Sequence, residues 1–122
     1  MHETVIASSL LKIITEEVTK QNKNLCVDEI HLKVGLLNCI EPETVKGCFE
    51  ILAENTVAQK AKIFVERMPL EGFCHDCKKN ISINKRHFTC PFCHSTNVSW
   101  QGGNEMQISS IKVHENNNEE NN

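Results

Sequence analysis

Two short stretches, CHDC at residues 74–77 and CPFC at residues 90–93, decide how this sequence is organised. Each is a Cys-x-x-Cys turn that aims two thiolates at one point, and twelve residues separate the two turns. Four thiolates complete a tetrahedron, the geometry of structural zinc sites with no open coordination position. The spacing is typical of a zinc ribbon, so we expect one structural zinc ion on Cys74, Cys77, Cys90 and Cys93.

Two other interpretations of these turns are disfavoured. The second turn with its following histidine also matches the attachment string of c-type haem, but haem attachment needs export and leaves Cys74 and Cys77 without a role. A thioredoxin-like redox pair needs a strand-to-helix setting, whereas the second turn lies between apparent strands. His75 and His94 adjoin the cysteines, and we interpret them as exposed turn residues. The alternative is that one of them replaces a thiolate ligand when conditions change.

The segment around the turns differs in charge from the rest of the chain. From Cys74 to Gly103 there are four basic residues and one acid, a net charge of +3, whereas the whole chain carries −3 and the remainder therefore −6. The basic residues and the ring beside them are Lys78, Lys79, Lys85, Arg86, His87 and Phe88. A zinc-ribbon adaptor for nucleic acid or protein is thus an alternative function. Because the acidic remainder repels nucleic acid, we expect the basic face to dock on an acidic protein.

On either side of this segment, the sequence has the periodicity of two helices and three strands. Apolar residues recur every three or four positions over residues 4–21, which predicts an amphipathic helix. Pro42, preceded by Glu41, is typical of the first turn of a second helix. Alternation with period two predicts strands over residues 29–34, 61–68 and 105–113. Because the last strand follows the cysteine segment, we expect it to rejoin the first sheet, which makes the segment an insertion.

These elements predict an α+β fold, with two helices packed on a small three-stranded sheet and an inserted zinc-ribbon module. The predicted α/β domain is discontinuous and comprises residues 1–70 and 104–114. Residues 71–103 form the predicted zinc-ribbon domain, and residues 115–122, which are only Glu and Asn, form a predicted disordered tail. Aromatic residues make up 5% of the 122 residues, so the core must be aliphatic. Cys48, on an apolar helix face, is assigned to it.

Composition argues against several classes of protein. No apolar run approaches the roughly 20 residues of a membrane span. The N-terminus lacks the basic flank of a secretory signal, so we expect a cytoplasmic protein without a membrane partner. Seven cysteines in a reducing compartment favour metal over disulfides. Neither a Ser-His-Asp or Cys-His catalytic set nor a glycine-rich phosphate loop is evident, so we expect a carrier and not an enzyme.

The first three residues, Met1-His2-Glu3, offer a second kind of metal site. A free amine, the next backbone nitrogens and the His2 imidazole can close chelate rings around one ion. Such a nitrogen-rich, planar set suits Ni(II) or Cu(II), although a lone histidine near a terminus is usually only solvated. Only deprotonated nitrogens bind, so protons compete below neutrality, near the reference histidine pKa of about 6.5.

Taken in order, the motifs resemble the HypA/HybF family of nickel metallochaperones for [NiFe]-hydrogenase maturation. The resemblance covers about residues 1–113, and Met-His-Glu at the start together with the paired Cys-x-x-Cys turns is its most specific part. The other matching motifs are Val34-Gly35 at a strand end, Pro42-Glu43 at a helix start and Gly103-Asn104-Glu105-Met106 before the last strand. Thr4, where an apolar residue is common in the family, and the Asn-rich tail are departures that touch no proposed ligand.

The resemblance implies a nickel site at His2 with Glu3 contributing, and a structural zinc on the four cysteines. It implies that Ni(II) is cargo, delivered to the hydrogenase large-subunit precursor together with a HypB-type GTPase. Some family members also feed urease, so urease maturation proteins are further candidate partners, as is a second copy of the chain in a homodimer.

Overall fold

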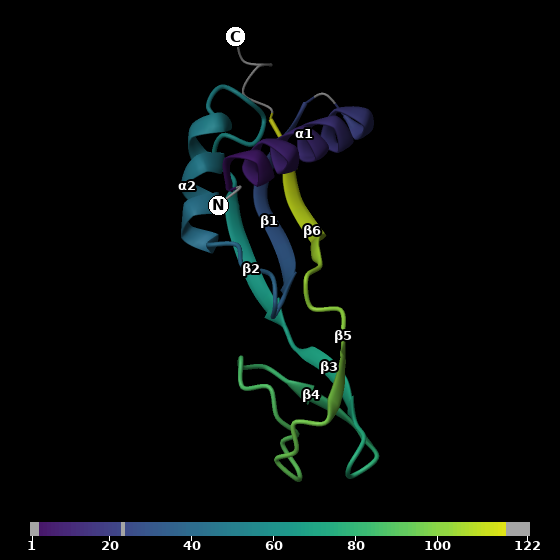
Figure 1. Cartoon of the computed structure of the whole chain (residues 1–122). Coiled ribbons are helices and arrows are strands. Elements are labelled where there is room, and N and C mark those ends of the chain that lie inside the picture. The colour runs from purple at the N-terminus through teal and green to yellow at the C-terminus, as the bar shows by residue number, and fades with distance from the viewer. Residues whose placement is uncertain (1–2, 23, 117–122) are drawn as a thin grey trace. The chain divides into compact units, whose positions relative to one another are not determined.

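The computed structural model describes residues 3–22 and 24–116, and within them the predicted fold class is confirmed (Figure 1). Two helices accompany two small three-stranded sheets. The elements in chain order are α1 Glu3–Gln21, β1 Leu25–Gly35, α2 Pro42–Leu52, β2 Lys62–Met68, β3 Leu70–Cys74, β4 Lys79–Ile83, β5 Val98–Gln101 and β6 Met106–Glu115. Among the described residues, no helix is long and apolar enough to cross a membrane.

The first sheet has the strand order β2-β1-β6, so the last strand does rejoin the strands that precede the cysteine segment. The second sheet has the order β4-β3-β5, and β3 pairs antiparallel with both neighbours. Neither β3 nor β5 was predicted. They span five and four residues, and their pairing depends on the turns that carry the cysteines.

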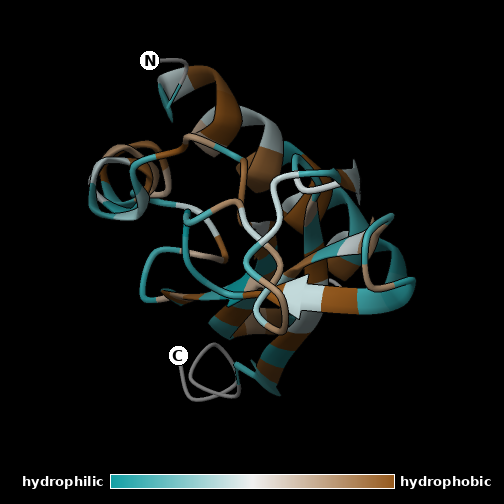
Figure 2. Cartoon of the chain, turned by 60° about the horizontal axis from the view of Figure 1, so that its bottom comes forward, coloured by the Kyte–Doolittle hydropathy of each residue, from teal (hydrophilic) through white to brown (hydrophobic). Residues whose placement is uncertain are grey.

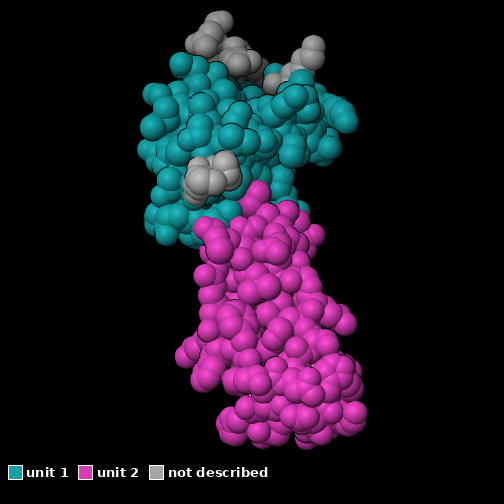
Figure 3. All heavy atoms as spheres, in the orientation of Figure 1, with its two compact units in different colours: residues 1–31, 40–64, 108–122 teal, residues 32–39, 65–107 magenta. Residues whose placement is uncertain are grey.

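The chain divides into two compact units (Figure 3). Unit 1 comprises residues 1–31, 40–64 and 108–122, and unit 2 comprises residues 32–39 and 65–107. This division assigns the end of β1 and the residues after it to the same unit as the cysteine turns. The domain boundaries given from the sequence stay predictions.

Unit 1 has an aliphatic core with a single large ring. The buried residues of α1 follow the predicted helical spacing and are Ala7, Leu10, Ile14 and Val18. Phe49 of α2 is 2% exposed and Ile30 of β1 is fully buried. Each of these Leu, Ile, Val or Phe side chains contributes roughly 1.5–3 kcal/mol relative to leaving it in water. Figure 2 shows brown, hydrophobic residues interspersed along the helices and strands.

Local signals in the sequence set the start of α2. Glu41 is the N-cap residue, with an extended backbone, and its side chain accepts a hydrogen bond from the Glu43 amide. Pro42 occupies the first turn, where its missing N–H would have no helical partner in any case. The helix therefore begins where the sequence predicted.

Two sequence predictions in unit 1 were wrong in detail. Cys48 is only half-buried, and its Sγ lies 3.6 Å from the Thr4 hydroxyl, so it joins the two helices rather than filling the core. Glu115, assigned to a disordered tail, is the last residue of β6, and the Asn116 amide donates to the Asn24 carbonyl. Backbone pairing can order a polar end without any apolar side chain. Residues 117–122 lie outside the described part of the chain.

In unit 2, the loop after β1 is fastened by two arginines. Arg67 donates to the carbonyls of Gly35 and Asn38, at 3.1 and 2.6 Å. Arg86 donates to the carbonyls of Leu36 and Asn38, at 3.1 and 3.3 Å. These bonds give the carbonyls of Gly35, Leu36 and Asn38 side-chain donors, which helps to satisfy the hydrogen-bonding groups of the loop backbone.

The turn before β6 also holds the loop after β1, through backbone hydrogen bonds. The Gly35 amide donates to the Glu105 carbonyl and the Leu37 amide to the Gly103 carbonyl, both at 2.8 Å. A side chain on Gly35 would run into the Gly103 carbonyl, and Gly103 itself has a φ of +103°. The backbone geometry therefore needs glycine both at position 35 and at position 103.

Candidate metal centres

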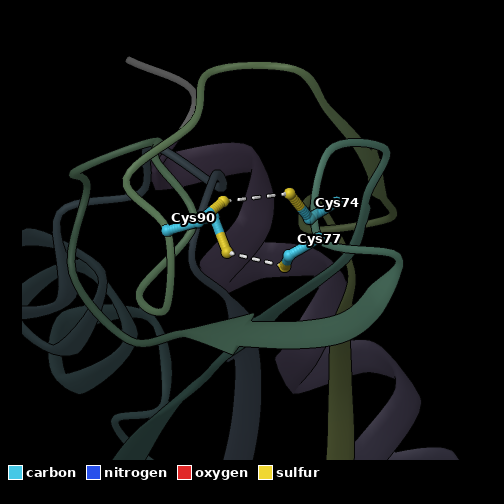
Figure 4. Close-up of side chains that lie close together, drawn as sticks. Cys74, Cys77 and Cys90 are labelled. Atoms are coloured by element: carbon cyan, nitrogen blue, oxygen red, sulfur yellow. Dashed lines mark hydrogen bonds between the residues drawn. The ribbon is translucent and has the colours of Figure 1, made fainter.

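The two Cys-x-x-Cys turns bring all four predicted zinc ligands together. Cys74 ends β3, Cys77 follows in the turn to β4, and the second pair lies between β4 and β5. Figure 4 shows the labelled side chains pointing toward one another. The Sγ atoms of Cys74 and Cys93 lie 3.6 Å apart, and those of Cys77 and Cys90 lie 3.7 Å apart. All four sulfur atoms lie within 4.8 Å of one another.

These distances fit a tetrahedral metal and exclude disulfides. Sulfur atoms about 2.3 Å from a central zinc ion lie about 3.8 Å apart along each edge of a tetrahedron. A disulfide would need about 2.05 Å, and all seven cysteines are free thiols. Among the described residues, this is the one group of three or more histidine, cysteine or acidic side chains with a ligand set this compact. The donor set therefore fits zinc.

The protein environment favours ionisation at one corner of the cluster. Burial opposes ionisation of Cys90, but backbone N–H groups at Cys93 and Phe92 outweigh it and lower the pKa of that thiol to about 7. Burial raises the pKa of Cys77 to about 12, and the neighbouring thiols add to this effect. Four close thiolates repel one another, so they need a cation to become ionised together.

Both turns end in the same backbone conformation. Lys78 and His94, each the residue after the second cysteine of its turn, have φ values of 59° and 64°. The His94 amide donates to the Cys90 carbonyl at 2.9 Å, which closes the second turn. Since His94 has the same position as a lysine in the first turn, its location is explained by the turn without a role as a metal ligand.

A second layer of hydrogen bonds holds the first turn. His75 pairs through Nε2 with the Ser99 hydroxyl at 2.6 Å. Ser95 and Asn97 both donate to the Asp76 carboxylate, and these bonds, Ser95 first, lower the pKa of Asp76. The side chains between the two ligands of this turn are thus engaged with residues near β5, which fixes where the thiols point.

The predicted nickel site is only partly described. His2 lies outside the described residues. Glu3 is the first residue of α1, and Thr4 beside it contacts Cys48 of α2. The start of α1 is thereby joined to α2. Sequence reasoning missed this link because a half-buried cysteine and a threonine carry no spacing signal.

Sequence reasoning also missed the roles of Arg67 and Arg86. Arg86 was assigned to a basic surface, whereas both residues bind loop carbonyls. What distinguishes these arginines from Lys85 is that they lie beside loop carbonyls, and the fold alone brings those carbonyls to them. No pattern in the sequence would have revealed it.

Residues 1–113 match the family described as "Hydrogenase/urease nickel incorporation, metallochaperone, hypA". A hydrogenase maturation factor HypA from Actinobacillus succinogenes is 32% identical over 113 residues, which are 93% of this chain and 99% of the relative. One from Rhizobium leguminosarum bv. viciae is also 32% identical, with the same coverage.

Solved structures agree with the sequence comparisons. The solution structure of the Ni metallochaperone HypA from Helicobacter pylori is 28% identical, with a TM-score of 0.59 and coverage of 92% of this chain and 97% of that one. A second solution structure, of a HypA protein, has 28% identity, a TM-score of 0.63 and coverage of 93% and 97%.

Proposed function

Because the chain belongs to the HypA family of hydrogenase and urease nickel metallochaperones, we propose that its Met-His-Glu start is the nickel site. His2 supplies an imidazole, the chain's own amine and backbone supply further nitrogens, and Glu3 contributes a carboxylate. The observation that supports this most directly is that the family match begins at residue 1, with the motif included. Nickel is the cargo in this proposal and is not a resident cofactor.

The same proposal assigns the four cysteines to a resident, structural zinc ion. Zinc held by four thiolates has no open position, so it supplies fold stability and no chemistry. Cys74 and Cys90 are fully buried, which suits a closed site. Nickel and zinc are thus bound by different residues, one set nitrogen-rich and the other all sulfur.

We further propose that the chain acts as a carrier and not as an enzyme, in the cytoplasm. Its partners are the hydrogenase large-subunit precursor and a HypB-type maturation GTPase, and urease maturation proteins are the alternative recipients. The family description names both hydrogenase and urease nickel incorporation, which supports recipients of these two kinds. A zinc-ribbon adaptor for nucleic acid is the competing function, and the net charge of −3 argues against it.

Nickel titration of the intact chain and of His2→Ala tests the site. We expect tight nickel binding to be lost in His2→Ala, because the imidazole closes one of the chelate rings, while one zinc per chain is retained. Isothermal titration calorimetry gives the affinity, and elemental analysis gives the zinc content. Hydrogenase maturation should fail with the same variant.

His114→Ala is the matched control, since His114 is an exposed histidine of unit 1 that binds Asp28 at 2.8 Å. It should bind nickel like the parent. A second variant extends the N-terminus but keeps His2, which should weaken binding if the amine is a ligand. Unchanged nickel affinity in His2→Ala contradicts the terminal site and makes His75 or His94 the next candidates.

A further inference from the structure

Unit 2 contains a hollow that neither metal site uses. Its volume is about 290 Å³, and it lies between the end of β4 and the second cysteine turn. No acidic side chain lines it. The polar residues that do are Ser82, Asn84, Lys85, His87, Thr89 and His94. Hydroxyl, amide, ammonium and imidazole groups of this kind can all donate hydrogen bonds.

The backbone of one segment is folded so that alternate side chains face the hollow. The His87 amide donates to the Lys85 carbonyl and the Thr89 amide to the His87 carbonyl, at 2.8 and 2.9 Å. These three residues line the hollow. The residues between them point elsewhere: Arg86 binds the carbonyls of the loop after β1, and Phe88 meets the Trp100 ring edge-on, with 6.1 Å between centroids.

Arg86 and Phe88 therefore anchor the backbone of the segment, which presents Lys85, His87 and Thr89 to the hollow before any ligand arrives. Preorganised donors lose less entropy on binding than free surface side chains. Lys79, in contrast, does not line the hollow, and its ammonium lies 4.7 Å from the centre of the Phe92 ring.

The hollow has no internal counter-charge. Within residues 3–22 and 24–116, no ion pair joins an acidic side chain to Lys85, His87 or His94. Asp76, the one acid between Cys74 and Gly103, is occupied by the Ser95 hydroxyl and the Asn97 amide. A ligand of opposite charge would thus meet donors that have no acidic partner in the described chain.

We propose that this hollow is a docking site for an acidic segment of a partner protein, whose carboxylates accept hydrogen bonds from Lys85, His87 and Thr89. Charge-assisted bonds of this kind are stronger than neutral ones. Nucleic acid fits less well, because no phenylalanine, tyrosine or tryptophan ring lines the hollow, and bases bind single-strand sites by stacking on such rings.

The test uses the full chain with zinc bound, and its probe is a capped hexaglutamate peptide. Binding is monitored by amide NMR at about 150 mM salt, where the screening length is about 8 Å. We expect peptide-dependent shifts at residues 84–89 and 94, and at least about tenfold weaker binding in Lys85→Glu, which corresponds to about 1.4 kcal/mol. Nickel binding by the same variant should match the parent, so this test is independent of the terminal site.

Lys78→Glu is the matched control, with the same charge change in the same module but outside the hollow. It should weaken peptide binding less than twofold. Equal losses in the two variants mean that only net charge matters and overturn the site, as does an absence of shifts at residues 84–89. Binding of inorganic phosphate as tight as that of the peptide overturns a peptide ligand, and tighter binding of an oligothymidine strand would establish nucleic acid as the partner instead.

Discussion

At the scale of single residues, the cysteine turns depend on positions that carry no ligand. Lys78 and His94 both have positive φ, which costs an ordinary side chain roughly 1–2 kcal/mol and glycine nothing. The turns keep this conformation in spite of its cost because it orients the thiols toward one another. The sequence predicted the ligands from their spacing, but a lysine or histidine at a left-handed position leaves no such signal.

Replacement of His94 therefore separates a turn residue from a ligand. His94→Gly should keep one zinc per chain and equal or exceed the parent in stability, whereas His94→Val should be less stable by about 1–2 kcal/mol, because a β-branched residue resists positive φ. Chemical unfolding of the zinc-loaded parent and variants measures their free energies of unfolding and so ranks their stabilities. Thr96→Gly, at an exposed position nearby, should destabilise slightly. Loss of zinc from His94→Gly would show that the imidazole is a ligand after all.

At the scale of elements, periodicity decided what the sequence could predict. α1 and α2 and the strands of the first sheet were expected within a few residues, because each is long enough to repeat an apolar pattern. β3 and β5 were not, because their pairing depends on the turns that carry the cysteines. The assignment of residues 32–39 to unit 2 was also missed, since arginine–carbonyl bonds have no sequence pattern.

The contribution of that loop can be measured through Arg86. Arg86→Ala removes the arginine donor to the Leu36 carbonyl and one of two arginine donors to the Asn38 carbonyl. A partly buried carbonyl left without its bond costs roughly 1–3 kcal/mol. We expect a loss of that size in the free energy of unfolding, and faster hydrogen exchange at the Leu37 amide.

Lys85→Ala, one position earlier, is the control for loss of a positive charge and a long side chain. It should change the free energy of unfolding by less than about 0.5 kcal/mol, as surface substitutions usually do. If both variants lose equal stability, the loop bonds of Arg86 contribute nothing of their own.

At the scale of the whole molecule, the two units differ in what stabilises them. Unit 1 has a continuous core of aliphatic residues and Phe49. The buried residues around the cysteines in unit 2 are Cys74, Ile81 and Cys90, with Cys77, Val98 and Trp100 packed against them. Half of this cluster consists of proposed zinc ligands, so its apolar content is small.

Removal of zinc should therefore unfold the cysteine segment alone. A structural zinc contributes roughly 10–16 kcal/mol in small finger peptides, which exceeds what this cluster can replace. After chelation, we expect amides of β3, β4 and β5 to lose protection from hydrogen exchange while those of α1 and α2 keep it. Cys90→Ala should behave in the same way without chelator. Retained protection in β3 in either sample would contradict a structural zinc at this cluster.

The loop fastened by Arg67 and Arg86 limits how the protein can be dissected. A fragment of residues 65–107 contains every cysteine of the metal cluster but lacks residues 32–39, whose carbonyls and amides bind both arginines, Gly103 and Glu105. A chimera that exchanges only residues 65–107 would contain both arginines without the loop of residues 32–39 that they bind. Transplanting this metal module into a different host protein therefore requires two separate segments of the chain, residues 32–39 and 65–107. The shorter segment comes from the N-terminal third of the chain.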